Sequence, residues 1–432
     1  MAESAEVSEA TALTVLNALL GGETVGLRCE AGRIAAIGPD VEPHPGDVTI
    51  DAAGAPLSAP LLNGHTHAAM TLFRGSGGDL PLMSWLREKI WPVEKRLEPQ
   101  DVYWGTRLAC AEMIRSGTTR FWDMYWFPEE AARAVADAGI RATVGAPLFD
   151  IGGDPAELRE AAIASLDRLS ECGPEIRPSL TPHSIYTVSE DSLRWIAELA
   201  GERQVPVHIH LSETETEVED CLREHGERPA FYLDRLGLLG ERTVLAHGVW
   251  LDRAELDLIA GRGCTVVANP VANMKLAVGG VFPLPEARAA GVAIGLGTDG
   301  AGSNDSLDLL ADLKLFALSQ KHAAADATAI EAGEAWEIAT GGRSPMLCGD
   351  QGSGPRKEPL SVGAAADFLL LDPGSPELAI GELTSNLVYA AAGAAVKATV
   401  VAGRVLMRDG ELPGLDEVVA RAAERAHRLG IS

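Results

Sequence analysis

The middle of this 432-residue chain alternates between short apolar runs and longer stretches with helical periodicity. The runs have the length and the composition of buried strands. Eight of them follow one another: residues 61–66, 118–123, 141–146, 177–181, 205–210, 243–246, 264–268 and 292–297. Amphipathic stretches lie between them, among them residues 128–138, 155–169, 189–200 and 284–290. Eight strand–helix units over residues 58–350 predict an α/β fold that closes into a parallel (β/α)8 TIM barrel.

An open, doubly wound parallel sheet is the alternative for such an alternating chain. Sheets of that kind that bind dinucleotides carry Gly-x-Gly-x-x-Gly between a strand and a helix. No such motif follows a predicted strand here, and Gly295-Leu296-Gly297 lacks the remaining glycine. The closed barrel is therefore the preferred prediction.

Both ends of the chain have the pattern of a small β domain, with a hairpin signal at Glu30-Ala31-Gly32. The predicted strands are residues 25–29, 34–37, 48–51, 367–371, 398–401 and 405–407. We expect residues 1–57 and 356–432 to form one β-sandwich, with a final helix over 414–429. Residues 58–355 are then the barrel.

Charge and composition exclude several classes of partner. The formal net charge is −26 and no lysine or arginine cluster relieves it, so we expect no binding to nucleic acid or to an anionic membrane. No apolar stretch approaches the roughly 20 residues of a membrane span, and the acidic start (Glu3, Glu6, Glu9) does not resemble a signal peptide. Six scattered cysteines without Cys-x-x-Cys spacing indicate reduced thiols. These features favour a cytoplasmic enzyme with a small-molecule substrate.

Polar and titratable side chains stand where the predicted barrel strands end. In a barrel of this kind, all carboxyl ends of the strands open onto one face, where active sites lie. In chain order the ends carry His65 with His67, Asp123, His183, His208 with His210 and nearby Glu213, His247, Asn269 and Asp299. The histidines concentrate there, which indicates a site.

The run Asn63-Gly64-His65-Thr66-His67 suits metal binding, because residues i and i+2 of a strand point to the same face. Nitrogen ligands with a carboxylate suit zinc or another borderline divalent ion. We predict four ligands: His65, His67, His210 and Asp299. Periodicity alone does not decide between His208 and His210. Glu213 is the candidate proton shuttle and His247 a group that orients hydroxide, an arrangement that favours hydrolysis.

Each of these residues also has a structural interpretation. His65 and His67 can be packing histidines, and His183 a satisfied structural one. Asp299, within Gly297-Thr298-Asp299-Gly300, can be a turn residue. Asp123 can cap a helix or pair with an arginine, so we assign it no catalytic role.

Several stretches, taken in order, resemble the amidohydrolase superfamily, and within it the methylthioadenosine/S-adenosylhomocysteine deaminase and chlorohydrolase branch. The matching stretches are NGHTH (63–67), DLPLMSWLREKIWPVE (79–94), DMYWF (123–127), TPHSIY (181–186), HIHLSET (208–214), LAHGV (245–249), NPVANMKLAVGG (269–280) and GTDGAGSND (297–305). They span the whole predicted barrel. The terminal β segments resemble the family's composite sandwich.

The resemblance implies one Zn²⁺ per subunit, with Fe²⁺ or Mn²⁺ as alternatives, bound by the same four residues: His65, His67, His210 and Asp299. It favours His210 over His208 because Leu-Ser-Glu follows His210. Glu213 resembles the family's proton shuttle to a ring nitrogen, and His247 its hydroxide-orienting histidine. Asp299 then helps to deliver a proton to the departing amine. Relatives form dimers or tetramers, so a homo-oligomer is expected.

The resemblance also implies a nucleoside site. Trp85 lines the pocket, Glu94 grips the ribose hydroxyls and His183 contacts the nucleoside. Family members that accept the homocysteine group carry arginines after the third strand, whereas this strand ends Val144-Gly145-Ala146-Pro147-Leu148. Arg159 nearby lies in a helical pattern and is a poor substitute. Ala268 also replaces a residue that is often polar in relatives.

We therefore expect deamination of an adenine nucleoside, such as methylthioadenosine or adenosine, to the inosine analogue and ammonia, with S-adenosylhomocysteine disfavoured. An alternative is an aminohydrolase or chlorohydrolase for another N-heterocycle, such as guanine or another oxopurine, a pterin or an s-triazine. A third is a metal-free barrel that binds a nucleoside without reacting.

Overall fold

The computed structural model describes residues 12–76, 80–151, 153–349 and 358–431. Three sequence-based predictions involve residues outside these ranges: the acidic N-terminus (Glu3, Glu6, Glu9), the first residue of the 79–94 stretch, Asp79, and the domain boundary at 355/356. The positions of the domain boundaries stay a prediction.

All eight predicted runs are strands, and two of them are split. The first four give β6 (Leu61–Thr66), β7 (Thr118–Met124), β8 (Arg141–Gly145) with β9 (Pro147–Leu148), and β10 (Ile176–Pro178) with β11 (Thr181–Pro182). The last four give β12 (Val207–Leu211), β13 (Thr243–His247), β14 (Thr265–Ala268) and β15 (Ala293–Leu296). Every neighbouring pair is parallel, in the orders β10-β8-β7-β6, β11-β9 and β12-β13-β14-β15.

Backbone contacts join these sheets into one ring. On one side, Leu180 forms a parallel bridge to Val207, and the His208 N–H donates to the Leu180 carbonyl at 2.9 Å. On the other side, the N–H of Asp299, beyond β15, donates to the carbonyl of His65 in β6 at 3.0 Å. The parallel barrel predicted from the alternating pattern is thereby confirmed.

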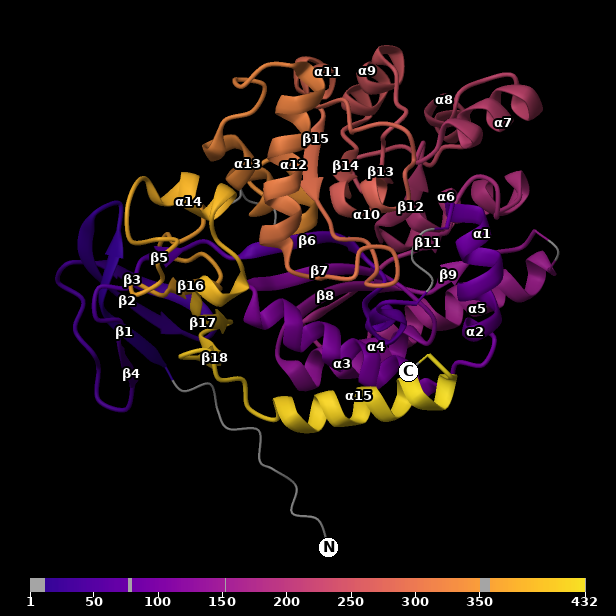
Figure 1. Ribbon diagram of the computed structural model, residues 1–432. Helices are drawn as coiled ribbons and strands as arrows, with labels where there is room; N and C mark the ends of the chain where they lie inside the picture. The colour runs from indigo at the N-terminus through magenta and orange to yellow at the C-terminus, as the bar shows by residue number, and fades with distance from the viewer. Residues whose placement is uncertain (1–11, 77–79, 152, 350–357, 432) are drawn as a thin grey trace, which may run out of the picture.

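Helices follow the strands and surround the barrel (Figure 1). The helices after the strands include α3 (Pro99–Arg115), α4 (Pro128–Ala138), α5 (Pro155–Leu169), α6 (Glu190–Arg203), α7 (Glu215–His225), α8 (Pro229–Arg235), α9 (Arg253–Arg262), α10 (Pro270–Lys275), α11 (Leu284–Ala290), α12 (Leu309–Ala324) and α13 (Ala332–Ala339). The predicted helices over 128–138, 155–169 and 284–290 have the observed bounds. The helix predicted over 189–200 begins one residue later and continues to Arg203.

One helical segment interrupts the first strand–helix unit. After η1 (Ala68–Phe73), it runs through α1 (Leu82–Trp85), a wider π-type turn η2 (Leu86–Ile90) and α2 (Trp91–Glu94). Pro92 has no N–H with which to continue an α-helical ladder, which gives a physical reason for the wider turn. This segment forms one wall of the cavity described below.

The interior of the barrel contains a small apolar cluster of its own. Its members are Leu62, Trp122, Val244, Val267, Met346 and Leu347. The last two come from η3 (Pro345–Cys348), and the Trp122 indole N–H donates to the Leu347 carbonyl at 3.2 Å. The η3 turn therefore packs against the inner strands.

The two ends of the chain build two sheets that face each other beside the barrel (Figure 1). One has the order β3-β2-β1-β4 and the other β18-β17-β16-β5. Their strands are β1 (Leu13–Leu20), β2 (Glu23–Glu30), β3 (Arg33–Gly38), β4 (Val48–Asp51), β5 (Leu57–Ser58), β16 (Phe368–Leu371), β17 (Val396–Val401) and β18 (Arg404–Arg408). Both sheets contribute to one buried core, which includes Leu27 and Phe368. The predicted sandwich of N- and C-terminal segments is confirmed.

The sequence patterns missed β1. Its sequence, LTVLNALL, is rich in leucine and alanine and holds an asparagine, so its β-propensity is weak. Asn17 adopts a left-handed φ of 55°, and the pairing with β2 shifts register between Val15 and Ala18. The strand is stabilised by its neighbours on both sides, β2 and β4.

The predicted C-terminal helix is α15 (Leu415–Leu429). It lies along α3 of the barrel and not on the sandwich (Figure 1). The guanidinium of Arg428 pairs with Asp101, whose side chain is fully buried, and Arg96 donates to the Leu429 carbonyl at 2.7 Å. The chain end is thus attached to the barrel. Earlier in the chain, α14 (Leu383–Tyr389) and η4 (Gly393–Ala395) connect β16 to β17.

Within the described ranges, no helix combines the length and the hydropathy needed to cross a bilayer. All six cysteines lie within these ranges, and no two of them are joined by a disulfide bond. The expectation of reduced thiols agrees with this finding.

Candidate active site

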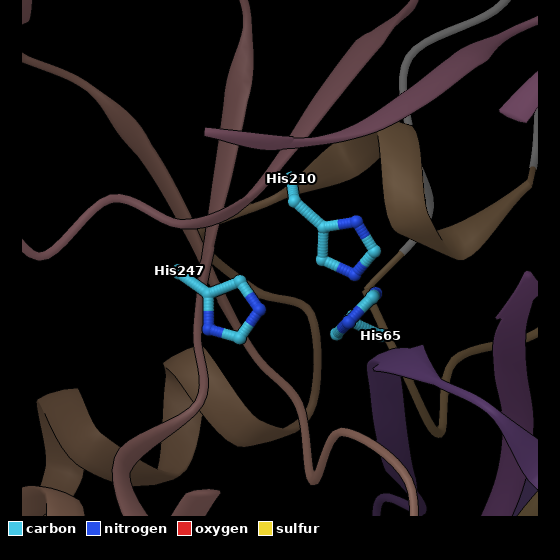
Figure 2. A group of neighbouring side chains, drawn as sticks. All are labelled: His65, His210 and His247. Carbon is cyan, nitrogen blue, oxygen red and sulfur yellow. The ribbon is translucent and has the colours of Figure 1, made fainter. Parts of the chain in front are cut away.

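The side chains at the carboxyl ends of the strands converge around His65 and His67. The ring centroids of these two histidines lie 5.0 Å apart and their planes are nearly perpendicular. Nε2 of His65 and Nε2 of His67 lie 3.3 Å and 3.2 Å from the same carboxylate oxygen, Oδ1 of Asp299. Nε2 of His210 lies 3.4 Å from Nε2 of His67. The four side chains predicted as ligands therefore meet at one point, and Figure 2 shows the rings of His65, His210 and His247 grouped together, with the plane of His65 nearly perpendicular to that of His210.

Carbonyl groups fix the ring orientation of two of these histidines. Nδ1 of His67 lies 2.6 Å from the Met124 carbonyl, and Nδ1 of His210 lies 2.7 Å from the His183 carbonyl. Because a carbonyl oxygen only accepts hydrogen bonds, both Nδ1 atoms carry the hydrogen. In the neutral rings, each Nε2 then presents its lone pair to the centre, as a metal ligand must.

Asp299 is held by backbone geometry that few residues adopt. Its φ is 62°, in the left-handed region, and its N–H bonds to the His65 carbonyl. Ser303 Oγ donates to Oδ2 at 2.7 Å, which leaves Oδ1 for the histidines. Burial raises the pKa of the Asp299 carboxyl, but the two imidazoles outweigh burial and hold that pKa well below its usual range. Such strained positions are concentrated at functional sites.

The cluster fits a divalent cation. Nε2 of His65 is completely buried and has no hydrogen-bond partner, although it points at Asp299. Burial lowers the pKa of His65 to about 4. Burial also disfavours the charged form of His67, but Asp299 outweighs this effect and raises the pKa of His67 to about 9. A positive charge is therefore favoured between the rings and the carboxylate. The ligand atoms of His65, His67 and Asp299 lie within 4.8 Å of one another, and so do those of His65, His210 and His247.

His208 lies behind this centre. Its Nε2 is 2.9 Å from Nδ1 of His65, the nitrogen that faces away from Asp299. Its ring packs edge-on against Trp122 inside the barrel. The geometry therefore brings His210, and not His208, to the other three side chains.

Glu213 and His247 flank the centre. Oε1 of Glu213 lies 3.9 Å from Nδ1 of His247, and burial raises the pKa of Glu213. Nδ1 of His247 lies 2.8 Å from Oδ1 of Asn273. An amide oxygen accepts, so this contact places the His247 hydrogen on Nδ1 and leaves Nε2 as the basic nitrogen. His247 itself adopts a φ of 76°.

A cavity of about 650 Å³, including its open mouth, lies directly over these groups. The three residues predicted to contact substrate, Trp85, Glu94 and His183, all line it. Burial raises the pKa of Glu94, which lies beside Tyr125 and Trp126, and burial lowers the pKa of His183 to about 3. His183 is therefore neutral, with Nδ1 held by the hydroxyls of Ser184 and Thr187.

The walls of the cavity are largely apolar. The helical segment contributes Leu82, Trp85, Leu86, Ile90, Trp91 and Glu94, at spacings that place them on one helix face. Opposite them, Phe149 stacks on Trp126 with centroids 5.6 Å apart and on His183 at 4.7 Å. Among the described residues that line the cavity, none is a lysine or an arginine.

Two strand-end residues lie outside the cavity wall. Asp123 is buried, its Oδ1 accepts from the Ala68 N–H at 2.7 Å, and burial raises its pKa to about 6. It thus caps the turn that carries His67, as one of the two structural interpretations predicted. Asn269 precedes α10 and is fully buried.

The sequence patterns predicted no role for Asn273, Ser303 or Phe149. Asn273 and Ser303 lie inside stretches that carry the family resemblance, but nothing in the sequence indicated that they contact His247 and Asp299. Phe149 follows the β9 strand, where the resemblance directed attention only to missing arginines.

A model of the amidohydrolase family matches residues 57–406. The chain belongs to this family. A curated relative, the 5'-deoxyadenosine deaminase of Methanoregula boonei, is 47% identical over 386 residues, which cover 88% of this chain and 86% of the relative. The 5-methylthioadenosine/S-adenosylhomocysteine deaminase of Syntrophobacter fumaroxidans is 44% identical over 400 residues, with 90% of each chain covered.

Among solved structures, an adenosine deaminase from Xanthomonas campestris with bound zinc superimposes with a TM-score of 0.89. It is 33% identical and the match covers 98% of both chains. Membership of the family, expected from the strand-end motifs, is confirmed, and so is the fold class.

Proposed function

We propose that this member of the amidohydrolase family is a zinc-dependent hydrolase that deaminates an adenine nucleoside, releasing ammonia and the inosine analogue. The observation that carries the proposal is the convergence of three imidazoles and Asp299 on one point, with Glu213 and His247 beside it, at the base of an open cavity. The names of the relatives, a 5'-deoxyadenosine deaminase and a 5-methylthioadenosine/S-adenosylhomocysteine deaminase, support an adenine nucleoside as the substrate class.

The donor set supports zinc. Three imidazole nitrogens and one carboxylate are ligands that suit this ion, and the similar Xanthomonas campestris protein is described with zinc bound. In this proposal, His65, His67, His210 and Asp299 hold the ion. When bound, such an ion lowers the pKa of a coordinated water molecule toward 7 and so supplies hydroxide at neutral pH.

The protein's own groups then move the protons. Water adds to C6 of the adenine ring, and Glu213 takes one of its protons and gives it to the adjacent ring nitrogen. Burial raises the pKa of Glu213, which brings it closer to that of the groups it serves. His247, oriented by Asn273, directs the attacking oxygen. Asp299 helps to deliver the second proton to the amino group, the C6–N bond breaks and ammonia leaves.

The remaining cavity residues support a nucleoside with a neutral 5'-substituent. We infer that Glu94 accepts hydrogen bonds from the two ribose hydroxyls, because a carboxylate offers two acceptor oxygens. Trp85 and His183 line the same space. The stacked Trp126 and Phe149 present apolar surface, and no described residue of the cavity lining is a lysine or an arginine that could compensate the carboxylate of S-adenosylhomocysteine. We further propose a cytoplasmic homo-oligomer.

The decisive test is ammonia release by the zinc-loaded protein across adenosine, 5'-deoxyadenosine, methylthioadenosine, S-adenosylhomocysteine and adenine. We expect the neutral nucleosides to react and Glu213→Gln to lower kcat by about 10²- to 10⁴-fold, since general acid–base catalysis contributes about that much. A preference for adenine or another free base, or a well-folded Glu213→Gln protein with near-full rate, would refute the proposal.

A further inference from the structure

Glu213 stands on a short turn with an unusual backbone. The turn follows β12 directly, and Ser212, its first residue, adopts a left-handed φ of 49°. L-residues with a Cβ rarely adopt this conformation, so the surroundings must hold it. The Ser212 carbonyl accepts from the Trp250 N–H at 2.9 Å, which fixes one side of the turn.

The other side of the turn is held by one carboxylate. Oε1 of Glu217 accepts from the Ser212 N–H at 2.8 Å, and Oε2 accepts from the Glu213 N–H at 2.9 Å. The Glu217 side chain is buried, and it stands on the first turn of α7, whose N-cap is Thr214. Two consecutive buried N–H groups are thus satisfied by the two oxygens of a single side chain.

This arrangement is not the usual helix cap. A glutamate at the third position of a helix commonly accepts from the N–H of the N-cap residue. Glu255 of α9 does so, because its Oε2 accepts from the N–H of the N-cap residue Asp252 at 3.1 Å. Glu217 occupies the equivalent position of α7, but it reaches past Thr214 to the two residues before it. Its side chain serves the turn that carries Glu213.

The chemistry of the contact requires a carboxylate. Both partners are donors, so the side chain must accept at both of its terminal atoms. A glutamine in this position would offer one acceptor and one donor, and it would leave one buried N–H facing an amide NH₂ group. An aspartate would keep both acceptors on a stem that is one methylene shorter.

We propose that Glu217 is a positioning residue that fixes the turn at Ser212 and Glu213 and so sets the direction in which the Glu213 carboxylate enters the cavity. Glu217 is not among the described residues that line the cavity, and both of its carboxylate oxygens accept from the backbone of the turn. The inference rests on the proposed role of Glu213 in proton transfer. Glu217 should therefore affect kcat only by positioning Glu213.

A double-mutant cycle tests the proposal, with kcat for adenosine or 5'-deoxyadenosine measured for Glu217→Gln, Glu213→Gln and the double variant. Misplacing a catalytic group by about 1 Å can reduce a rate by about 100-fold, so Glu217→Gln should lower kcat by about 10- to 100-fold, with KM changed less than about twofold. In the Glu213→Gln background, the second substitution should lower kcat less than about twofold, because residues that act as one unit are non-additive. Zinc content, measured by elemental analysis, should be equal in all four proteins.

Glu255→Gln is the matched control, since it removes a buried helix-start glutamate that lies outside the cavity lining. We expect it to lower the melting temperature and to leave kcat within about twofold. If Glu217→Gln does not fold, Glu217→Asp replaces it in the cycle, and failure of both to fold would assign Glu217 a structural role and overturn the proposal. Wild-type kcat in Glu217→Gln, or an equal loss in both backgrounds, would overturn it too. Absence of ammonia release by the wild-type protein would instead overturn the proposed function.

Discussion

We propose that Glu94 is the residue that distinguishes a nucleoside from a free base in this cavity. It stands on α2, on the helix face that lines the cavity, and its neighbours there are Tyr125 and Trp126. A free base offers no pair of vicinal hydroxyls for a carboxylate to bind.

We expect Glu94→Gln to lower kcat/KM for adenosine by about 10- to 100-fold, because hydrogen bonds to a charged group contribute about 1.5–3 kcal/mol. For 2',3'-dideoxyadenosine, which lacks both hydroxyls, the loss should be small. Steady-state ammonia release with the two substrates measures the difference. Glu88→Gln, an exposed change on the same helical segment, is the control. An equal loss of kcat/KM with both substrates would show that Glu94 does not bind the ribose hydroxyls.

Three residues at the site adopt strained backbone conformations that the sequence did not predict. Ser212, His247 and Asp299 all adopt positive φ values, and each stands at or just beyond the end of a barrel strand. None is a glycine, so no residue type signalled the conformation. The recognisable chemistry of His247 and Asp299 identified them instead, while Ser212 stayed unnoticed because its role is to shape the backbone.

At the scale of the element, two glycines, one within β15 and one just beyond it, allow other groups to pack closely against the backbone. A Cβ on Gly295 would lie 2.3 Å from Cδ1 of Leu347, inside the barrel. A Cβ on Gly297, just beyond the strand, would lie 2.5 Å from Oδ1 of Asn269 and 2.9 Å from the backbone nitrogen of His65. The two glycines therefore permit different close approaches, one to the barrel interior and one to the site.

Gly295→Ala and Gly297→Ala form a matched pair of variants. We expect Gly295→Ala to lower the free energy of unfolding by about 1–3 kcal/mol through overpacking, with kcat nearly unchanged in the folded protein. Gly297→Ala should in addition lower kcat, because it pushes on the backbone of His65. Urea unfolding and steady-state kinetics on both proteins provide the comparison. A larger loss of kcat in Gly295→Ala than in Gly297→Ala would contradict this explanation.

The strands and helices of the barrel were predictable because each has a strong periodic pattern. Pro128–Ala138 begins with proline and is followed by Gly139, the signals that start and end helices. The pattern failed where tertiary contacts supply the stability, as in β1, whose register shift at Asn17 disturbs the alternation of residues. It also gave no indication that α15 packs on α3, since an amphipathic helix does not encode its partner.

At the scale of the whole molecule, the predicted ion would connect parts of the barrel that are distant in sequence. Its proposed ligands come from the ends of β6 and β12 and from the segment after β15. Binding to the folded state alone stabilises it by about 2.7 kcal/mol at a free concentration 100 times the dissociation constant. Ion removal should therefore lower the stability of the barrel as well as its activity.

We expect a chelator to abolish ammonia release and to lower the melting temperature, and added Zn²⁺ to restore both. Calorimetry with parallel elemental analysis measures stability and ion content. The control is His208→Gln, a change behind the site that keeps the four predicted ligands. Full removal of the ion with no change in melting temperature would contradict the predicted coupling between strands.

The sequence by itself determined the order of strands and helices, the polar strand ends and the identity of the groups placed there, because these follow from periodicity and from side-chain chemistry along the chain. Only the tertiary structure decided where Glu217 places its two acceptor oxygens and how the aromatic wall at Trp126 and Phe149 stacks. These outcomes depend on contacts between segments far apart in the sequence, on closure of the barrel and on backbone angles that no local pattern specifies.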